Sequence, residues 1–186
     1  MNMFLENKFT EIEKEFGFHK EIDWLSKIVY IDKKLEQYKK NVKINIRAIY
    51  TLHNILVEEE YPFEEQNKMS YFLQKWFLES NNRFQNDAVY LFFIGKILYI
   101  SEWFFGLKDN TLAFEFQERA FDIEPKNILY EWGYALAKNE KERVYILSKA
   151  ILFKNKKILD WLKQYGFAGN YMIESLMYCY KNYNPY

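Results

Sequence analysis

The chain has little glycine, proline or cysteine. Its 186 residues include 6 Gly, 3 Pro and 1 Cys. Proteins built from antiparallel sheets need a turn about every 8 to 12 residues, and these turns usually contain Gly, Pro, Asn or Asp. The scarcity of glycine and proline therefore favours long helices. The lone Cys179 excludes an internal disulfide and any zinc site made of several cysteines.

The chain also has no excess of charge of either sign. Its 26 basic and 26 acidic residues give a formal net charge of +0 at pH 7. A dedicated nucleic-acid binder usually has a basic excess, because its affinity depends on neutralising phosphates. The N-terminal sequence MNMFLENKFTEIEKEF is charged and helix-like, unlike a signal peptide. We therefore expect a cytoplasmic protein that is not dedicated to nucleic acid.

Motifs that carry known chemistry are missing from the sequence. It contains no GxxxxGK[ST], GxGxxG, GxSxG or HExxH pattern. His53 lies on the apolar stripe of its helix, so we expect it to pack in the core with one hydrogen bond. His19 follows Gly17 in a predicted turn and is expected to be solvated. We expect Cys179 to be a buried, inert thiol, and we predict no catalytic residue, no cofactor and no metal site.

Large apolar side chains are abundant. Hydrophobic residues make up 49% of the chain and aromatic residues 20%, and such side chains fill a core efficiently. The length fits one domain or one small helical solenoid. We predict a single all-α domain over residues 1–186. Its N-terminal helices occupy residues 1–80, and a central buried helix with stacked antiparallel hairpins occupies residues 81–182.

Helical spacing of apolar residues supports about eight or nine helices. In the N-terminal part, Ile46, Ile49, His53 and Leu56 follow a helical period. The alternation that begins at Val42 resembles a strand for a few residues, but we favour a helix there. We expect a mostly solvated segment at residues 31–44 and a loop at residues 80–82. Further helices are predicted at residues 63–80, 110–122, 128–138, 140–153, 156–164 and 170–182.

The segment 88–105 is the most apolar part of the chain. It is about as long as a membrane-spanning helix. However, Lys96 and Glu102 would each cost about 2.5–3.5 kcal/mol in a bilayer. Asp87, directly before the segment, is suited to cap a helix in water. We therefore predict a buried central helix.

The sequence AFEFQERAFDIEP at residues 113–125 resembles the second helix of a tetratricopeptide repeat. Ala113, Ala120 and Pro125 occupy the positions of the small residues and the closing proline of that family. Gly95 corresponds to the glycine of the preceding helix, whereas Gln117 stands where the family has an aromatic residue. The resemblance covers roughly residues 88–157 and implies stacked helical hairpins. Any antiparallel helix pair can also place small residues at its closest contact.

Acidic residues surround two aromatic residues at the end of one predicted helix and the start of the next. We call this group the acidic corner; it comprises Glu58, Glu59, Glu60, Tyr61, Phe63, Glu64 and Glu65. Such a charged group is often an ordinary solvated face. The alternative is a docking surface for a basic partner, with Tyr61 and Phe63 as apolar anchors.

The whole chain resembles the small cytoplasmic immunity proteins of bacterial toxin systems, including contact-dependent growth inhibition. The segments 90–106 and 113–137 are the most suggestive parts. The resemblance implies an all-α protein, not an enzyme, that binds and neutralises one cognate toxin domain, often a nuclease. In that case the acidic corner would bind the toxin.

Two other functions remain open. A tetratricopeptide-like scaffold would hold a peptide or partner protein in a groove, and Lys96, Asn127 and Lys138 are the candidate contacts. A nucleic-acid-binding protein or an enzyme of an unfamiliar family would instead use a basic stretch on phosphates. That stretch comprises Lys33, Lys34, Lys39, Lys40, Lys43 and Arg47.

Overall fold

The computed structural model describes residues 3–16 and 22–184, and they form an all-α fold with no strand among them. This confirms the predicted fold class. The helices of the described residues are α1 (Met3–Glu13), α2 (Trp24–Leu35), α3 (Val42–Glu58), α4 (Phe63–Phe84), α5 (Ala88–Ser101), α6 (Thr111–Ile123), α7 (Ile128–Ala137), α8 (Lys141–Lys154), α9 (Lys156–Lys163) and α10 (Phe167–Asn182). Two short 3-10 helices, Glu36–Tyr38 and Glu102–Phe105, follow α2 and α5.

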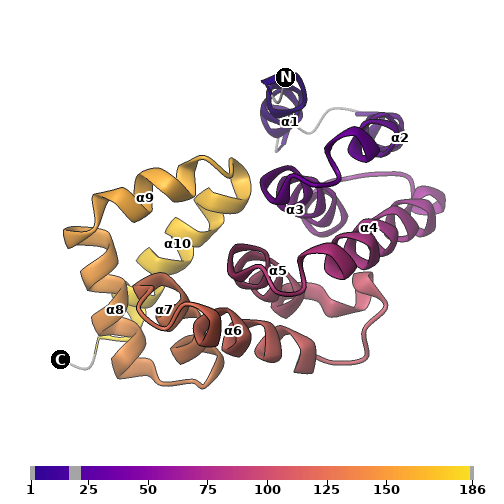
Figure 1. The fold of residues 1–186 in the computed structure, drawn as a ribbon. Coiled ribbons are helices and arrows are strands. Elements are labelled where there is room, and N and C mark those ends of the chain that lie inside the picture. The colour runs from indigo at the N-terminus through magenta and orange to yellow at the C-terminus, as the bar shows by residue number, and fades with distance from the viewer. Residues whose placement is uncertain (1–2, 17–21, 185–186) are drawn as a thin grey trace.

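Helix α5 lies between the two halves of the bundle (Figure 1). Helices α1 to α4 pack on one side of it, and α6 to α10 curve around the other side. The last helix, α10, packs against α8 and α9 and also reaches α3. The C-terminal helix therefore joins the second half of the chain to the first.

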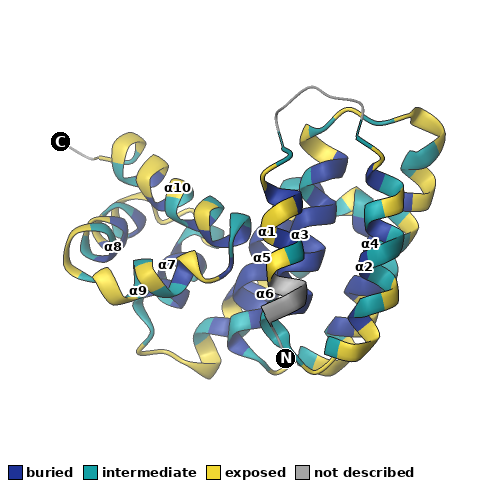
Figure 2. Ribbon diagram, turned by 90° about the horizontal axis from the view of Figure 1, so that it is seen from above, coloured by how far each residue is buried: buried dark blue, intermediate teal, exposed yellow. Residues whose placement is uncertain are grey.

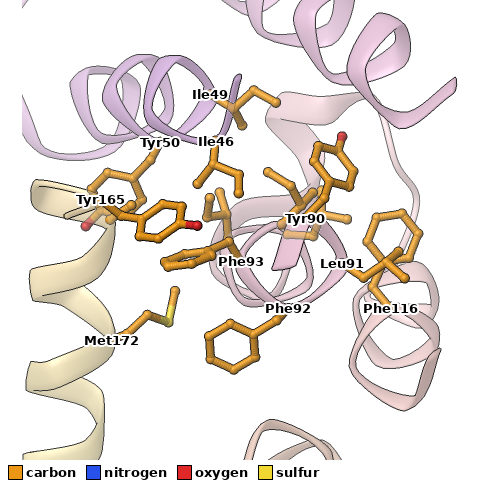
Figure 3. Packing of buried hydrophobic residues seen from close by; sticks show 14 of the residues in the cluster. Ile46, Ile49, Tyr50, Tyr90, Leu91, Phe92, Phe93, Phe116, Tyr165 and Met172 are labelled. Atoms are coloured by element: carbon orange, nitrogen blue, oxygen red, sulfur yellow. The ribbon is translucent and has the colours of Figure 1, made fainter. Parts of the chain in front are cut away.

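The core is built around α5, and this explains why that helix is apolar on every side. Phe92 packs against Tyr130 of α7, with ring centroids 5.4 Å apart. Phe93 stacks on Tyr165, which follows α9, at 4.4 Å. Figure 3 shows Phe92, Phe93 and Tyr165 together with isoleucines of α3 and Met172 of α10. Each fully buried side chain of this size contributes about 1.5–3 kcal/mol relative to an exposed one.

The segment Ala88–Phe105 is long and apolar enough to cross a membrane, and it is the one such segment in the described part of the chain. Most of it is buried inside the bundle, as the dark blue ribbon of α5 in Figure 2 shows. Its apolar surface is thus covered by other helices of the same chain. The predicted buried central helix is confirmed.

Helices α5 and α6 approach each other closely at Gly95. A methyl group on Gly95 would lie 3.0 Å from the carbonyl oxygen of Ala113 and closer still to the Gln117 amide. Neither Ala113 nor Ala120 has more than 2% of its surface exposed. Small residues therefore lie at the closest contact of this antiparallel hairpin, as predicted. Descent from tetratricopeptide repeats stays a prediction.

Polar side chains fix several helix starts. Asp87 accepts a hydrogen bond from the backbone N–H of Tyr90, and Asn127 accepts one from Leu129. The cap by Asp87 was predicted. Asn41 caps α3 by accepting from the N–H of Ile44. This cap explains why the strand-like alternation after Val42 forms a helix.

The segment 31–44 is less solvated than predicted. Helix α2 continues to Leu35, and Ile31 and Leu35 are both buried. Because this segment contains many lysines, the apolar stripe formed by Ile31 and Leu35, four residues apart, was not recognised in the sequence. The lysines lie on the outer side of that stripe.

The loop predicted at residues 80–82 is also wrong, because α4 continues to Phe84. The Ser80 hydroxyl donates to the carbonyl oxygen of Phe77, within its own helix, at 3.1 Å. It also forms a 2.8 Å hydrogen bond with the hydroxyl of Tyr90. These bonds inside the core hold a serine that would otherwise favour a turn.

The helix count exceeds the predicted eight or nine by one or two. Asn155 separates α8 from α9 by a single residue, with φ −128° and ψ 65°. Its side chain then caps α9 by accepting from Ile158. The predictions for Gly17 and His19 lie outside the described residues.

Candidate docking surface

The acidic corner connects α3 to α4. Glu58 is the last residue of α3, and Pro62 is the N-cap of α4. The hydroxyl of Tyr61 donates to the carbonyl oxygen of Leu56 at 2.9 Å. The N–H of Glu65 donates to the carbonyl oxygen of Pro62, also at 2.9 Å. These two bonds, one at each helix end, hold the connection in a defined shape at the outer edge of the bundle (Figure 1).

Phe63 is the most exposed large apolar side chain among the described residues, at 83%. Tyr71, two turns further along α4, is 64% exposed. Eight positions correspond to about 12 Å along the helix and an offset of about 80° around it, so Tyr71 lies on an adjoining side of α4. An exposed aromatic side chain such as Phe63 is a typical anchor for a partner protein.

Carboxylates surround Phe63. Glu58, Glu60 and Glu64 are exposed, and Glu65 is partly buried. No lysine or arginine in the described ranges lies within 4.0 Å of these four carboxylates. Their charges therefore add to one negative field around an apolar side chain.

The helix dipole affects these carboxylates differently at the end of α3 and at the start of α4. Glu64 and Glu65 lie in the first turn of α4, where a helix dipole stabilises negative charge. Glu58 lies in the last turn of α3, which contains no basic residue, and there the dipole opposes a carboxylate. The charge of Glu58 thus costs stability, and a role in the fold does not account for it.

Tyr61 occupies a different position from Phe63. Its ring packs against the core and is only partly exposed, and burial raises the pKa of its hydroxyl. Tyr61 therefore shapes the connection between the helices, and Phe63 is the residue that projects toward solvent.

His53 is a core residue, as the sequence predicted. It is 2% exposed, and its Nε2 forms a 2.5 Å hydrogen bond with the hydroxyl of Ser101. Its ring stacks on Phe105 at 5.9 Å. Burial lowers the pKa of His53 to about 4, so the ring is neutral at pH 7. Its hydrogen bond and packing hold α3 against the end of α5.

Cys179 and the possible metal ligands were the other candidates for chemistry. Cys179 is buried, and burial raises the pKa of its thiol, which keeps it protonated. Within the part of the chain that the structure describes, no group of three His, Cys, Asp or Glu side chains could hold a metal ion.

One member of the predicted basic stretch, Arg47, lies in the core. Arg47 is 5% exposed, and its Nη2 lies 3.0 Å from Oε1 of Glu13 in α1. The assignment of Arg47 to a solvated basic stretch is therefore wrong, because its helix turns it toward α1. Lys39 forms an ion pair with Glu36.

Comparison with known protein families, with curated proteins and with solved structures found no match for this chain. The structure's own geometry is thus the basis for a functional proposal.

A cavity between α5, α6, α7 and α10 was missed in the sequence. Its one buried cation is Lys96, in the middle of the most apolar helix. That position was the available signal, but in the sequence it served only as an argument against a membrane span and as a candidate contact of a peptide scaffold. The other walls come from segments far apart in the sequence.

Proposed function

We propose that this chain is a binding protein that neutralises a basic toxin domain through its acidic corner, as an immunity protein does. Exposed Phe63 within a group of carboxylates is the observation that carries the proposal. In this role the chain acts in the cytoplasm and performs no reaction. It works by covering the active site or the substrate surface of the toxin.

The two kinds of residue in the acidic corner have separate roles. The carboxylates attract a positively charged partner and raise the rate of encounter. Phe63 enters a pocket on the partner and slows dissociation, because a buried aromatic anchor supplies much of the binding energy. Basic nuclease domains need positive charge to bind phosphates, so they suit this surface.

The structure gives less support to the other two functions. Lys96 is buried, Lys138 pairs with Glu118 at 3.3 Å, and Asn127 caps α7. A row of polar contacts for a peptide is therefore not presented along successive helices. A nucleic-acid-binding surface made of the basic stretch could not use Arg47, because Arg47 is buried and paired with Glu13.

The triple substitution Glu58/Glu59/Glu60→Lys tests the proposal. We expect the gene beside this one to encode a large secreted protein with a C-terminal toxin domain, and that domain is the binding probe. Charge reversal should lower the association rate by at least about tenfold, because steering depends on charge. Surface plasmon resonance measures the rate, and survival of cells that co-express the toxin domain measures protection. Phe63→Ala should mainly raise the dissociation rate.

The matched control is Glu115/Asp122/Glu142→Lys, which changes the net charge equally at exposed positions of α6 and α8. Binding should stay within about threefold of the original protein, since the altered charges lie away from the contact. Equal losses in both triple variants would show that only net charge matters. Full binding by the first variant would overturn the acidic corner as the contact surface.

A further inference from the structure

A cavity of about 520 Å³ lies between α5, α6, α7 and α10. Small-molecule sites typically have volumes of about 300–1,000 Å³. Its floor contains Gly95, Lys96, Gln117 and Gly133, and Cys179 lines it from α10. The side chain of Gln117 fills the space beside both glycines, so these glycines let its amide lie close to the backbones of α5 and α7.

Lys96 provides a cation without a carboxylate partner. The residue is 7% exposed, and its Nζ lies 5.0 Å from the ring centroid of Trp132. No aspartate or glutamate lines the cavity in the described part of the chain. Burial lowers the pKa of Lys96 to about 8, and Cys179 is the nearby titratable group whose charge affects it. At pH 7 the amine still carries a proton, and a buried charge without a counter-ion is unfavourable.

Gln117 provides an acceptor without a donor. Its Nε2 donates to the carbonyl oxygen of Phe92 at 2.8 Å, which fixes the orientation of the amide. Its Oε1 is buried and has no hydrogen-bond partner. Gly133 faces this oxygen, and a side chain there would collide with it. A buried polar atom without a partner is unfavourable, and a bound ligand with a donor would satisfy it.

Aromatic side chains form part of the remaining walls, together with Leu136, Ala137, Asn139 and Ser175. The rings of Tyr99 and Phe114 meet edge to face at 5.7 Å, and those of Tyr178 and Tyr183 at 6.4 Å. Tyr99 and Tyr178 are more than half exposed, so they stand at the mouth of the cavity. Flat rings at an entrance suit a planar apolar ligand.

We propose that this cavity binds a small aromatic carboxylate that carries an N–H or O–H donor. The carboxylate pairs with Lys96, the donor bonds to Oε1 of Gln117, and the aromatic body lies between the tyrosine rings. The inference does not depend on the acidic corner, which belongs to α3 and α4.

Three probes separate these contacts: indole-3-acetate, its neutral amide indole-3-acetamide, and 1-naphthylacetate, which lacks the ring N–H. Titration calorimetry at pH 7 should show that indole-3-acetate binds most tightly. The amide should bind about 10- to 100-fold more weakly, because a hydrogen bond to a charged group is worth about 1.5–3 kcal/mol. Loss of the ring N–H should weaken binding by a smaller factor.

Lys96→Met should remove most of the preference for the acid over the amide. It should also raise the melting temperature, since it removes an uncompensated buried charge. The matched control is Lys149→Met, which removes a surface ammonium 5.9 Å from the ring of Tyr145. Its binding should equal that of the original protein.

Three results would overturn the inference: no binding of any probe, equal binding of the acid and the amide, or unchanged binding in Lys96→Met. A lower melting temperature in Lys96→Met, with binding intact, would identify the amine as a purely structural partner of Trp132. If Lys96→Met does not fold, Tyr99→Ala at the exposed mouth provides the test. It should weaken indole-3-acetate and 1-naphthylacetate together, and an unchanged affinity would contradict the proposed site.

Discussion

Glu58 illustrates at the scale of one residue how binding and stability can conflict. Its carboxylate lies at the end of α3 where the helix dipole is negative. Glu58→Gln should therefore raise the free energy of unfolding by about 0.3–1 kcal/mol at low ionic strength. The same change should weaken partner binding. Urea denaturation at low and high salt measures the first effect, which should shrink as salt is added.

Glu64→Gln is the matched control, because Glu64 lies in the first turn of α4. There the dipole favours the carboxylate, so the same chemical change should lower stability. If both variants shift stability in the same direction, the helix dipole is not the cause.

His53 makes the stability of the fold depend on pH. Its pKa is about 4 in the folded protein, against about 6.5 in an unfolded chain. Between these values the unfolded state binds a proton that the folded state does not. The stabilising contribution is therefore complete above pH 6.5 and is lost as the pH falls toward 4.

The measurable consequence is a difference between the original protein and His53→Gln. Lowering the pH from 7 to 4 should cost the original protein roughly 3 kcal/mol more of unfolding free energy than the variant. Urea denaturation at both pH values gives this difference, in which the titration of other groups largely cancels. Identical pH dependence in both proteins would show that His53 takes up a proton as readily in the folded core as in the unfolded chain.

Single residues were predictable where a local pattern determines their place. His53 and Cys179 lie on apolar helix faces, and both are buried as expected. Arg47 was misplaced because its partner, Glu13, is 34 residues away and the sequence does not show that they meet. Lys96 was recognised as unusual, but its surroundings depend on α7 and α10, and so its cavity could not be inferred.

At the scale of helices, the contact between α9 and α10 allows a sharp test. A methyl group on Gly169 would overlap the carbonyl oxygen of Leu162 and lie 2.5 Å from its carbonyl carbon. Replacing glycine by alanine within an exposed helix normally stabilises it by about 1 kcal/mol. Gly169→Ala should instead destabilise the protein by about 1–3 kcal/mol, because backbone must move.

Asn170→Ala is the control, because Asn170 follows Gly169 in α10 and its side chain is exposed. Thermal denaturation should show little change for Asn170→Ala and a clear decrease for Gly169→Ala. A higher melting temperature for Gly169→Ala would mean that α9 and α10 do not approach so closely.

Helix starts were easier to predict than helix lengths. Asp87 and Asn127 signal their caps within three residues, so the sequence contains the whole cause. The ends of α2 and α4 depend on burial by other helices. Leu35 belongs to a helix because it reaches the core, and Ser80 stays helical because Tyr90 bonds to it.

At the scale of the whole molecule, the two proposed surfaces lie on different parts of the bundle. The acidic corner lies at the outer edge of the N-terminal helices, and the cavity lies among the C-terminal helices (Figure 1). Helix α5 contacts both α3 and α6, so it lies between the two regions. The all-α class followed from composition and periodicity, whereas the meeting of α10 with α3 joins distant parts of the sequence and had no local signal.

The central position of α5 has a consequence for biosynthesis. Helix α5 is synthesised before α6, α7 and α10, so an unfinished chain contains a strongly apolar helix without several of its packing partners. The charge of Lys96 disfavours insertion of this helix into a membrane before the later helices are made. The unfinished protein stays vulnerable to aggregation until its final helix has been translated.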